Sequence, residues 1–200
     1  MAMLKITFMG AGSTVFARNV LGDVMCTPAL QECEIALYDI DGTRLDESFR
    51  ILSTINQNIN QGRAVIKPYL GVENRKEALR GAKFVVNAIQ VGFYEPCTVI
   101  DFEIPKKYGL RQTIADTLGI GGIMRALRTI PVLEDFARDM EEVCPDALFL
   151  NYTNPWPCSP AICSATPACR PWACATACRP ALSTCWRAWA WRTSWRAARS

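Results

Sequence analysis

The chain of 200 residues contains no histidine, although half of its residues are hydrophobic. The absence of histidine excludes an imidazole as a catalytic base or as a metal ligand. No hydrophobic run reaches the roughly 18 residues of a membrane span, and no signal peptide precedes the first strand-like segment. Ten cysteines would suit a secreted disulfide framework, but the four before residue 156 lie far apart. We therefore expect a cytoplasmic protein with reduced thiols and no membrane partner.

A second set of absences divides the chain in two. Residues 156–200 lack Asp, Glu, Lys and Gly, yet they hold all six tryptophans and six of the ten cysteines. Residues 1–155 have 16 Lys and Arg against 19 Asp and Glu, a net charge of −3, and the six arginines of the tail turn the total to +3. The overall charge therefore says little about partners, and we expect no nucleic-acid partner. We expect one domain at residues 4–155 and an aberrant tail, not a domain, at residues 156–200.

Strand and helix patterns alternate along the first part, which predicts an α/β fold with a Rossmann-like, doubly wound parallel sheet. Pro131 should kink or restart the last helix. Gly42 with a capping pair of Thr43 and Asp46 is expected to open the second helix. The expected strands are Leu4–Met9, Glu34–Tyr38, Ala64–Leu70, Phe84–Val91 and Ala147–Leu150, and the expected helices lie around Phe16–Val24, Leu45–Ile55 and Ile123–Leu133.

A glycine-rich turn follows the first expected strand. Such a turn lets the backbone and a helix N-terminus approach a pyrophosphate, and an acidic residue after the second strand can bind ribose hydroxyls. The third glycine of the usual pattern would fall at Val15, where the helix could not pack as closely. A plain turn is the alternative interpretation. The residues expected to bind a dinucleotide are Gly10, Gly12, Ser13, Thr14 and Asp39.

Three polar clusters follow later elements, where functional loops of such sheets lie. They are Gln90–Glu95, Gln112–Gly122 and Asn151–Pro155. Each by itself is compatible with an ordinary surface loop.

The amino-acid sequence of these segments resembles that of a known family. Five segments are similar to the α-galactosidase and α-glucosidase branch of glycoside hydrolase family 4: KITFMGAGST, DIDGTRL, YEPCTVIDFEIPKKYGL, QTIADTLGIGGIMRALRTIP and LNYTNP. The resemblance covers residues 4–155 and implies an NAD- and Mn²⁺-dependent glycosidase, a homo-oligomer that acts on a small α-galactoside or a related glycoside.

The resemblance implies chemistry unlike the two-carboxylate scheme of most glycosidases. NAD⁺ oxidises the sugar 3-hydroxyl, a divalent metal stabilises the enolate, and a tyrosine removes the proton at carbon two. The glycosidic bond breaks by elimination, water adds, and the hydride returns. Oxidation makes the neighbouring C–H acidic, and a metal acts as a Lewis acid on the resulting oxyanion.

Site residues follow from the resemblance position by position. The glycine turn and Asp39 would hold NAD. Asp116 matches the acidic residue that makes the catalytic tyrosine more basic, and Gln90 stands where relatives specific for sugar phosphates carry an arginine, which favours an unphosphorylated sugar. Ile120 replaces a typical proline beside Gly121 and Gly122. The residues expected to bind substrate are Asn154, Asn151 and Gln90.

The resemblance breaks after Pro155. The family continues with Met-Ala-Met and then a Gly-Leu-Cys-His-Ser segment whose Cys and His ligate the metal, whereas this chain continues with Trp156-Pro157-Cys158. We therefore expect no metal ligands in this chain, no catalytic tyrosine and no C-terminal substrate domain. An inactive fragment is the expected state.

The tail has two interpretations. Interleaved Trp and Arg at Trp186–Arg192 could stack on bases or enter a membrane interface, although the six cysteines contain no Cys-x-x-Cys pair. The interpretation we favour is a lost reading frame. When codons are shifted from Pro155 onward, the chain admits Met-Ala-Met-Leu-Thr-Gly, and across Pro171–Ala177 it admits Val-Gly-Leu-Cys-His-Ser-Val, the missing metal segment.

Two rival functions remain for the whole chain. An NAD-dependent dehydrogenase of the lactate/malate type shares the architecture but expects a histidine base, which this chain lacks. A non-catalytic nucleotide-binding module with a basic interaction tail is the second rival, and removal of residues 156–200 would then abolish partner binding.

Overall fold

The structure is a computed structural model that describes residues 3–113, 119–154 and 170–173. Its centre is a six-stranded parallel sheet in the order β3-β2-β1-β4-β5-β6. The strands are β1 (Leu4–Met9), β2 (Cys33–Asp39), β3 (Val65–Leu70), β4 (Phe84–Asn87), β5 (Leu148–Asn151) and β6 (Arg170–Ala173). The strand order reverses between β1 and β4, as in doubly wound dinucleotide-binding folds. The predicted fold class is confirmed.

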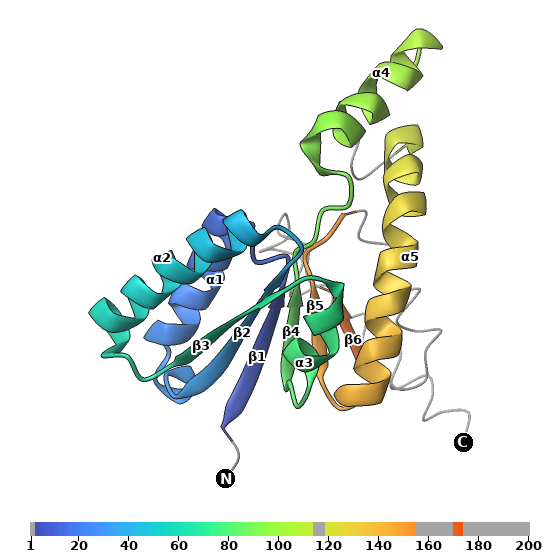
Figure 1. The fold of residues 1–200 in the computed structure, drawn as a ribbon. Helices are drawn as coiled ribbons and strands as arrows, with labels where there is room; N and C mark the ends of the chain where they lie inside the picture. The colour runs from blue at the N-terminus through green and yellow to red at the C-terminus, as the bar shows by residue number, and fades with distance from the viewer. Residues whose placement is uncertain (1–2, 114–118, 155–169, 174–200) are drawn as a thin grey trace, which may run out of the picture.

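Helices cover both faces of this sheet (Figure 1). On one face α1 and α2 pack on Ile6 and Phe8 of β1, and on the other α3 and α5 pack around Met9 and Val85. Successive side chains of a strand point to opposite faces, so β1 serves both cores. The helices are α1 (Thr14–Cys26), α2 (Gly42–Asn60), α3 (Arg75–Leu79), α4 (Val99–Lys107) and α5 (Gly119–Val143); short 3-10 turns lie at Pro28–Leu30 and Val72–Asn74.

The cap of α2 differs from its prediction. Asp41 is the N-cap, and its Oδ1 accepts hydrogen bonds from the N–H groups of Thr43 at 3.0 Å and Arg44 at 3.2 Å. The expected pair of Thr43 and Asp46 was wrong, because Thr43 already lies inside the helix. Asp41 has the extended backbone that lets a side chain reach the first free N–H groups.

The strand expected at Phe84–Val91 is shorter in the structure. β4 ends at Asn87, and the chain turns at Gly92, which has a φ of +85°. A π-helical turn at Phe93–Thr98 and α4 follow, where the sequence patterns predicted only a polar loop. Figure 1 shows α4 projecting away from the sheet beside the first half of α5.

Pro131 does not restart α5. The helix continues from Gly119 to Val143 with Pro131 inside it (Figure 1). Pro131 is exposed, and buried residues on both sides of it, Ala126, Leu133 and Phe136, hold the two halves of the helix to the same body. We attribute the continuity to this packing, which offsets the one hydrogen bond that proline cannot make.

Within residues 156–200, only β6 is described. Its four residues pair in parallel with β5, from Leu148 opposite Arg170 to Asn151 opposite Ala173. The expectation that this tail forms no domain of its own otherwise lies outside the described residues. No helix in the described part of the chain is long and apolar enough to cross a membrane.

Candidate dinucleotide-binding site

The turn after β1 depends on glycine. Gly10 has a φ of +85°, and a Cβ on it would lie 2.8 Å from the backbone of Ala88 and Ile89. The N–H groups of Gly10 and Ala11 both donate to the carbonyl of Tyr38, at 2.9 and 3.0 Å. This geometry brings the backbone of residues 10–14, which we call the glycine turn, against β2 and the loop after β4.

The N-terminus of α1 lies at the end of the glycine turn. Ser13 is the N-cap, and among the described residues no side chain caps the helix and no acidic residue occupies its first turn. The first N–H groups of a helix favour an anion in that situation. Thr14 donates weakly to the carbonyl of Gly12 at 3.5 Å. The end of α1 is therefore suited to a phosphate.

Val15 does not hold α1 away from the sheet, contrary to the expectation. Its side chain is 64% exposed, whereas Ala17 and Leu21 of the same helix are fully buried. The position of the third glycine thus faces away from the core in this chain, and a larger residue costs no packing there.

Asp39 meets the glycine turn, as the sequence predicted. Its Oδ2 accepts a hydrogen bond from the N–H of Gly12 at 2.6 Å, and its Oδ1 accepts one from the N–H of Asp41 at 3.0 Å. A Cβ on Gly12 would lie 2.8 Å from Asp39 Oδ2. The carboxylate is half-buried and still opens on the cleft.

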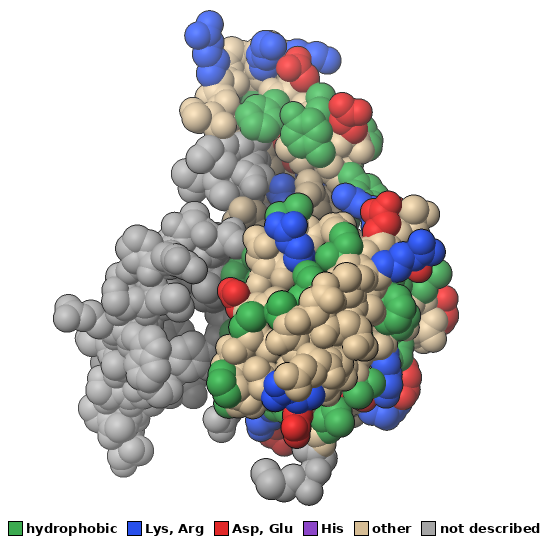
Figure 2. Space-filling view, turned by 90° about the vertical axis from the view of Figure 1, so that its left-hand side faces the viewer, with side chains coloured by type: hydrophobic (Ala, Val, Ile, Leu, Met, Phe, Trp, Pro, Cys, Tyr) green, Lys and Arg blue, Asp and Glu red, His purple; other side chains and the backbone are tan. Residues whose placement is uncertain are grey.

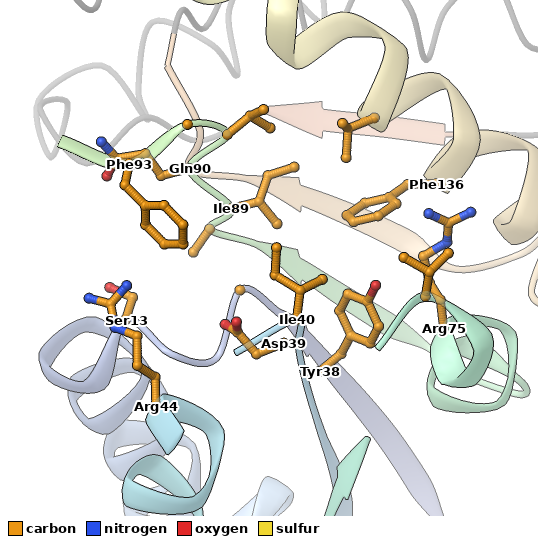
Figure 3. A pocket seen from close by; sticks show the side chains of 16 residues that line it. Ser13, Tyr38, Asp39, Ile40, Arg44, Arg75, Ile89, Gln90, Phe93 and Phe136 are labelled. Carbon is orange, nitrogen blue, oxygen red and sulfur yellow. The ribbon is translucent and has the colours of Figure 1, made fainter. Parts of the chain in front are cut away.

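A cleft of about 330 Å³ lies beside this turn (Figure 3). Gly10, Ser13 and Asp39 form one wall, and the segment Ala88–Phe93 forms another. The remaining lining residues are Tyr38, Ile40, Arg44, Val72, Arg75, Val132 and Phe136. Desolvation raises the pKa of Tyr38 above its ordinary value.

Ion pairs and ring contacts fix the walls of the cleft. Arg75 Nε donates to Asp139 Oδ2 at 2.5 Å, and its guanidinium lies 4.9 Å from the centre of the Phe136 ring. Arg128 pairs with the buried Asp101 and donates from Nε to the Val91 carbonyl at 3.3 Å. The Asp101 hydrogen bond raises the pKa of Arg128. The loop after β4 is thereby tied to α4 and α5.

A second polar group lies at the ends of β4 and β5. Asn87 Nδ2 donates to Asn151 Oδ1 at 2.8 Å and to Thr153 Oγ1 at 3.1 Å, and Thr153 Oγ1 donates to the Ile89 carbonyl at 3.0 Å. We call Asn87, Asn151 and Thr153 the amide cluster. All three are buried, and among the described residues Asn87 Oδ1 has no hydrogen-bond partner. Sequence analysis missed Asn87, although an amide that ends a hydrophobic strand is a usable signal.

The residues expected to bind substrate differ in burial and in hydrogen-bond partners. Asn151 is 1% exposed and belongs to the amide cluster. Asn154 is half-buried, and its carbonyl accepts from Arg125 Nε at 3.1 Å. Gln90 is exposed on the cleft and donates weakly to Thr98 Oγ1 at 3.5 Å. Asp116 lies outside the described residues.

The start of α5 also has a support that the sequence did not reveal. Gln112 Nε2 donates to the Asp101 carbonyl at 2.8 Å, and Gln112 Oε1 accepts from the N–H of Gly121 at 2.9 Å. Gly121 and Gly122 are buried, whereas Ile120 is 45% exposed. Gln112 therefore joins α4 to the first turn of α5.

The cysteines of the described part are free thiols, as expected. Cys33 and Cys144 are buried, and burial raises the pKa of Cys33 to about 11. No group of three His, Cys, Asp or Glu side chains within the described residues could hold a metal ion.

Comparison with known proteins gives this architecture a family. The model of family 4 glycosyl hydrolases matches residues 5–171. The chain belongs to this family. It is 65% identical to an α-galactosidase of Bacillus subtilis (strain 168) over 153 residues, which are 76% of this chain and 34% of that relative. The family match extends beyond Pro155 into the tail.

Solved structures of the family have the same fold. The putative glucosidase lplD of Bacillus subtilis has a TM-score of 0.73 at 28% identity, over 87% of this chain and 38% of that one. A 6-phospho-α-glucosidase from gut microorganisms, in complex with NAD and glucose-6-phosphate, has a TM-score of 0.71 at 25% identity, over 86% and 40%. The chain thus spans about a third of the length of the curated relatives it matches.

Proposed function

We propose that this chain is the NAD-binding part of a family-4 glycosidase whose substrate is an α-galactoside. One observation supports the dinucleotide site above all. The glycine turn, the N-terminus of α1 and Asp39 meet in one cleft at the point where the strand order reverses. That is where doubly wound sheets bind dinucleotides. The α-galactosidase at 65% identity supports the choice of sugar.

The residues present fit NAD. Gly10 packs without a side chain against Ala88 and Ile89, and Gly10 and Ser13 line the cleft, so the backbone of the glycine turn would be the part that approaches a pyrophosphate. The first turn of α1 would hold the phosphates, and Asp39 would accept hydrogen bonds from the ribose hydroxyls. NAD⁺, when bound, supplies a hydride acceptor. The segment Ala88–Phe93 would exclude water from that side of the cleft.

The substrate would lie beyond the ends of β4 and β5. Asn154 and Gln90 stay our proposed substrate-contacting residues, Asn151 is proposed to act on the substrate only through the loop it holds, and Asp116 stays our proposed partner of a tyrosine in the longer protein. Because Asn151 is buried, we assign it to holding the loop that carries Asn154. The described residues do not fit Mn²⁺, so we derive no step through a metal. We also propose a cytoplasmic homo-oligomer without nucleic-acid or membrane partners.

The tail belongs to the same proposal. We propose that the reading frame is lost at the Pro155 codon, since the shifted frame restores a Cys-His segment across Pro171–Ala177. β6 (Arg170–Ala173) overlaps the start of this stretch, and the family match ends at residue 171. Sequencing of the DNA around the Pro155 codon decides the matter, and an unbroken original frame would refute it. We expect the 200-residue chain to hydrolyse no α-galactoside and the restored frame to do so with NAD⁺ and Mn²⁺.

Isothermal titration of the 200-residue chain with NAD⁺ tests the cofactor site directly. We expect weak but measurable binding that Gly12→Val abolishes, because the new side chain would displace Asp39. Gly22→Val is the matched control, since Gly22 lies in α1 and a Cβ there would meet no heavy atom within 4 Å. Equal binding by the parent chain and Gly12→Val would contradict the proposed site.

A further inference from the structure

Two arginines line the cleft, and they differ in their partners. Arg75 is buried and paired with Asp139 at 2.5 Å. Arg44 is exposed, and within the described residues its guanidinium has no carboxylate at ion-pair distance. Across the cleft, Arg44 Cζ lies 5.7 Å from the centre of the Phe93 ring, over the face of that ring (Figure 3). Arg44 therefore presents to the cleft a positive charge that has no direct ion-pair partner among the described residues.

Arg44 lies beside Asp39 at the glycine turn. A Cβ on Gly12 would lie 2.8 Å from Asp39 Oδ2 and 3.0 Å from Arg44 Cβ, so the Asp39 side chain ends near the point where the Arg44 side chain begins. Asp41 caps the first turn of α2 through the N–H of Arg44, which fixes the backbone from which the guanidinium extends. A carboxylate and an unpaired guanidinium thus flank the position proposed for the adenosine ribose.

We propose that Arg44 is a specificity residue that binds a phosphate on the ribose 2′-oxygen, so that the cleft accepts NADP⁺ as well as NAD⁺. The inference rests on the proposed dinucleotide site. Asp39 suits two free hydroxyls but repels a 2′-phosphate, which carries a charge of about −1.5 to −2 near neutral pH. The planar guanidinium offers paired N–H donors that match phosphate oxygens. Arg44 would leave the Phe93 ring to make this contact.

Titration calorimetry of the 200-residue chain with NAD⁺ and with NADP⁺ tests this assignment. We expect Arg44→Ala to raise the Kd for NADP⁺ by about tenfold or more, since a charged hydrogen bond is lost. The Kd for NAD⁺ should stay within about threefold, because its ribose has no phosphate for Arg44 to bind. Arg44→Lys should recover part of the NADP⁺ affinity, because the charge remains while the paired donors do not.

Arg50→Ala is the matched control. Arg50 belongs to the same helix, its side chain is 77% exposed, and it pairs with Asp46 rather than facing the cleft. This variant removes the same charge from α2 and should change neither Kd. Thermal unfolding of both alanine variants should match the parent chain, since both side chains are exposed.

Each remaining outcome overturns the assignment. Equal loss of NAD⁺ and NADP⁺ affinity in Arg44→Ala would assign Arg44 to the pyrophosphate instead. Unchanged Kd values for both, or a parent chain that binds NAD⁺ but not NADP⁺, would reject the 2′-phosphate contact and leave the NAD site standing. A parent chain that binds neither dinucleotide would reject both this inference and the proposed function.

Discussion

The two polar regions at the carboxyl edge of the sheet are built by different means. The glycine turn is held by backbone atoms, since the N–H groups of Gly10, Ala11 and Gly12 contact Tyr38 and Asp39. The amide cluster is held by side chains that are 64 and 66 residues apart in sequence. A backbone-built site depends on the absence of side chains, whereas a side-chain cluster depends on a complete set of partners. The first should fail when atoms are added and the second when atoms are removed.

Adding atoms to the glycine turn should give the largest effect. Gly10→Val combines a left-handed backbone with a clash against Ala88 and Ile89, and we expect it to lower the free energy of unfolding by about 4 kcal/mol. Urea unfolding followed by circular dichroism measures this, with Gly22→Val as the control. A loss below that of Gly22→Val would show that the turn relaxes freely.

Removing atoms from the amide cluster should give the next largest effect. Asn87→Ala leaves Asn151 Oδ1 and Thr153 Oγ1 without their shared donor, so we expect a loss of about 2 kcal/mol of stability. NAD⁺ affinity should change by less than about threefold, because Asn87 does not line the cleft. Asn19→Ala on the exposed face of α1 is the control. Loss of NAD⁺ binding with stability unchanged would reverse the proposed division between the regions.

The buried thiol of Cys33, at the amino end of β2, should make the stability of the chain depend on pH independently of both polar regions. Burial raises the pKa of Cys33 from 9.0 to about 11, so the thiol keeps its proton to a higher pH in the folded state than in the unfolded state. The resulting stability is fully present below pH 9 and is lost as pH rises toward 11, by about 2 kcal/mol in total. Cys33→Ala should flatten this part of the stability–pH curve, whereas Cys26→Ala, at an exposed site, should not. Identical curves for both variants would contradict the buried-thiol explanation.

The smallest effect is expected at Val15, which lies in the first turn of α1 where the usual pattern has its third glycine. Val15→Ala should change the free energy of unfolding by about 0.5 kcal/mol or less, since the side chain is 64% exposed. NAD⁺ affinity should also be unchanged. A destabilisation above about 1 kcal/mol in urea unfolding would show that Val15 packs on something that its exposure does not reveal.

The same contrast explains how much the sequence could predict. β1, the glycine turn and Asp39 follow from local patterns, because each is specified within a few residues and their order along the chain sets their meeting point. Asn87 gives no local sign of the partners it finds in Asn151 and Thr153. Gln112 likewise joins α4 to α5 only after both helices are placed.

Two predictions from local sequence patterns, the cap of α2 and the break at Pro131, were wrong. Thr43 and Asp46 match a capping pattern, but Asp41 lies nearer the end of β2 and takes the first N–H groups. Pro131 predicts a break that tertiary packing prevents. The resemblance named residues for a substrate site, yet Asp116 lies outside the described residues and its role remains a prediction.

The border strand β3 has a consequence for how the chain behaves in concentrated solution. Among the described strands β3 lies at one edge of the sheet, and it carries Lys67 and Pro68 in its middle. Proline has no N–H to offer a strand from another molecule, and an edge lysine opposes a close apolar approach. Figure 2 shows charged side chains around the margins of the visible face of the molecule as well. Edge-to-edge aggregation through β3 should therefore be disfavoured even at high protein concentration.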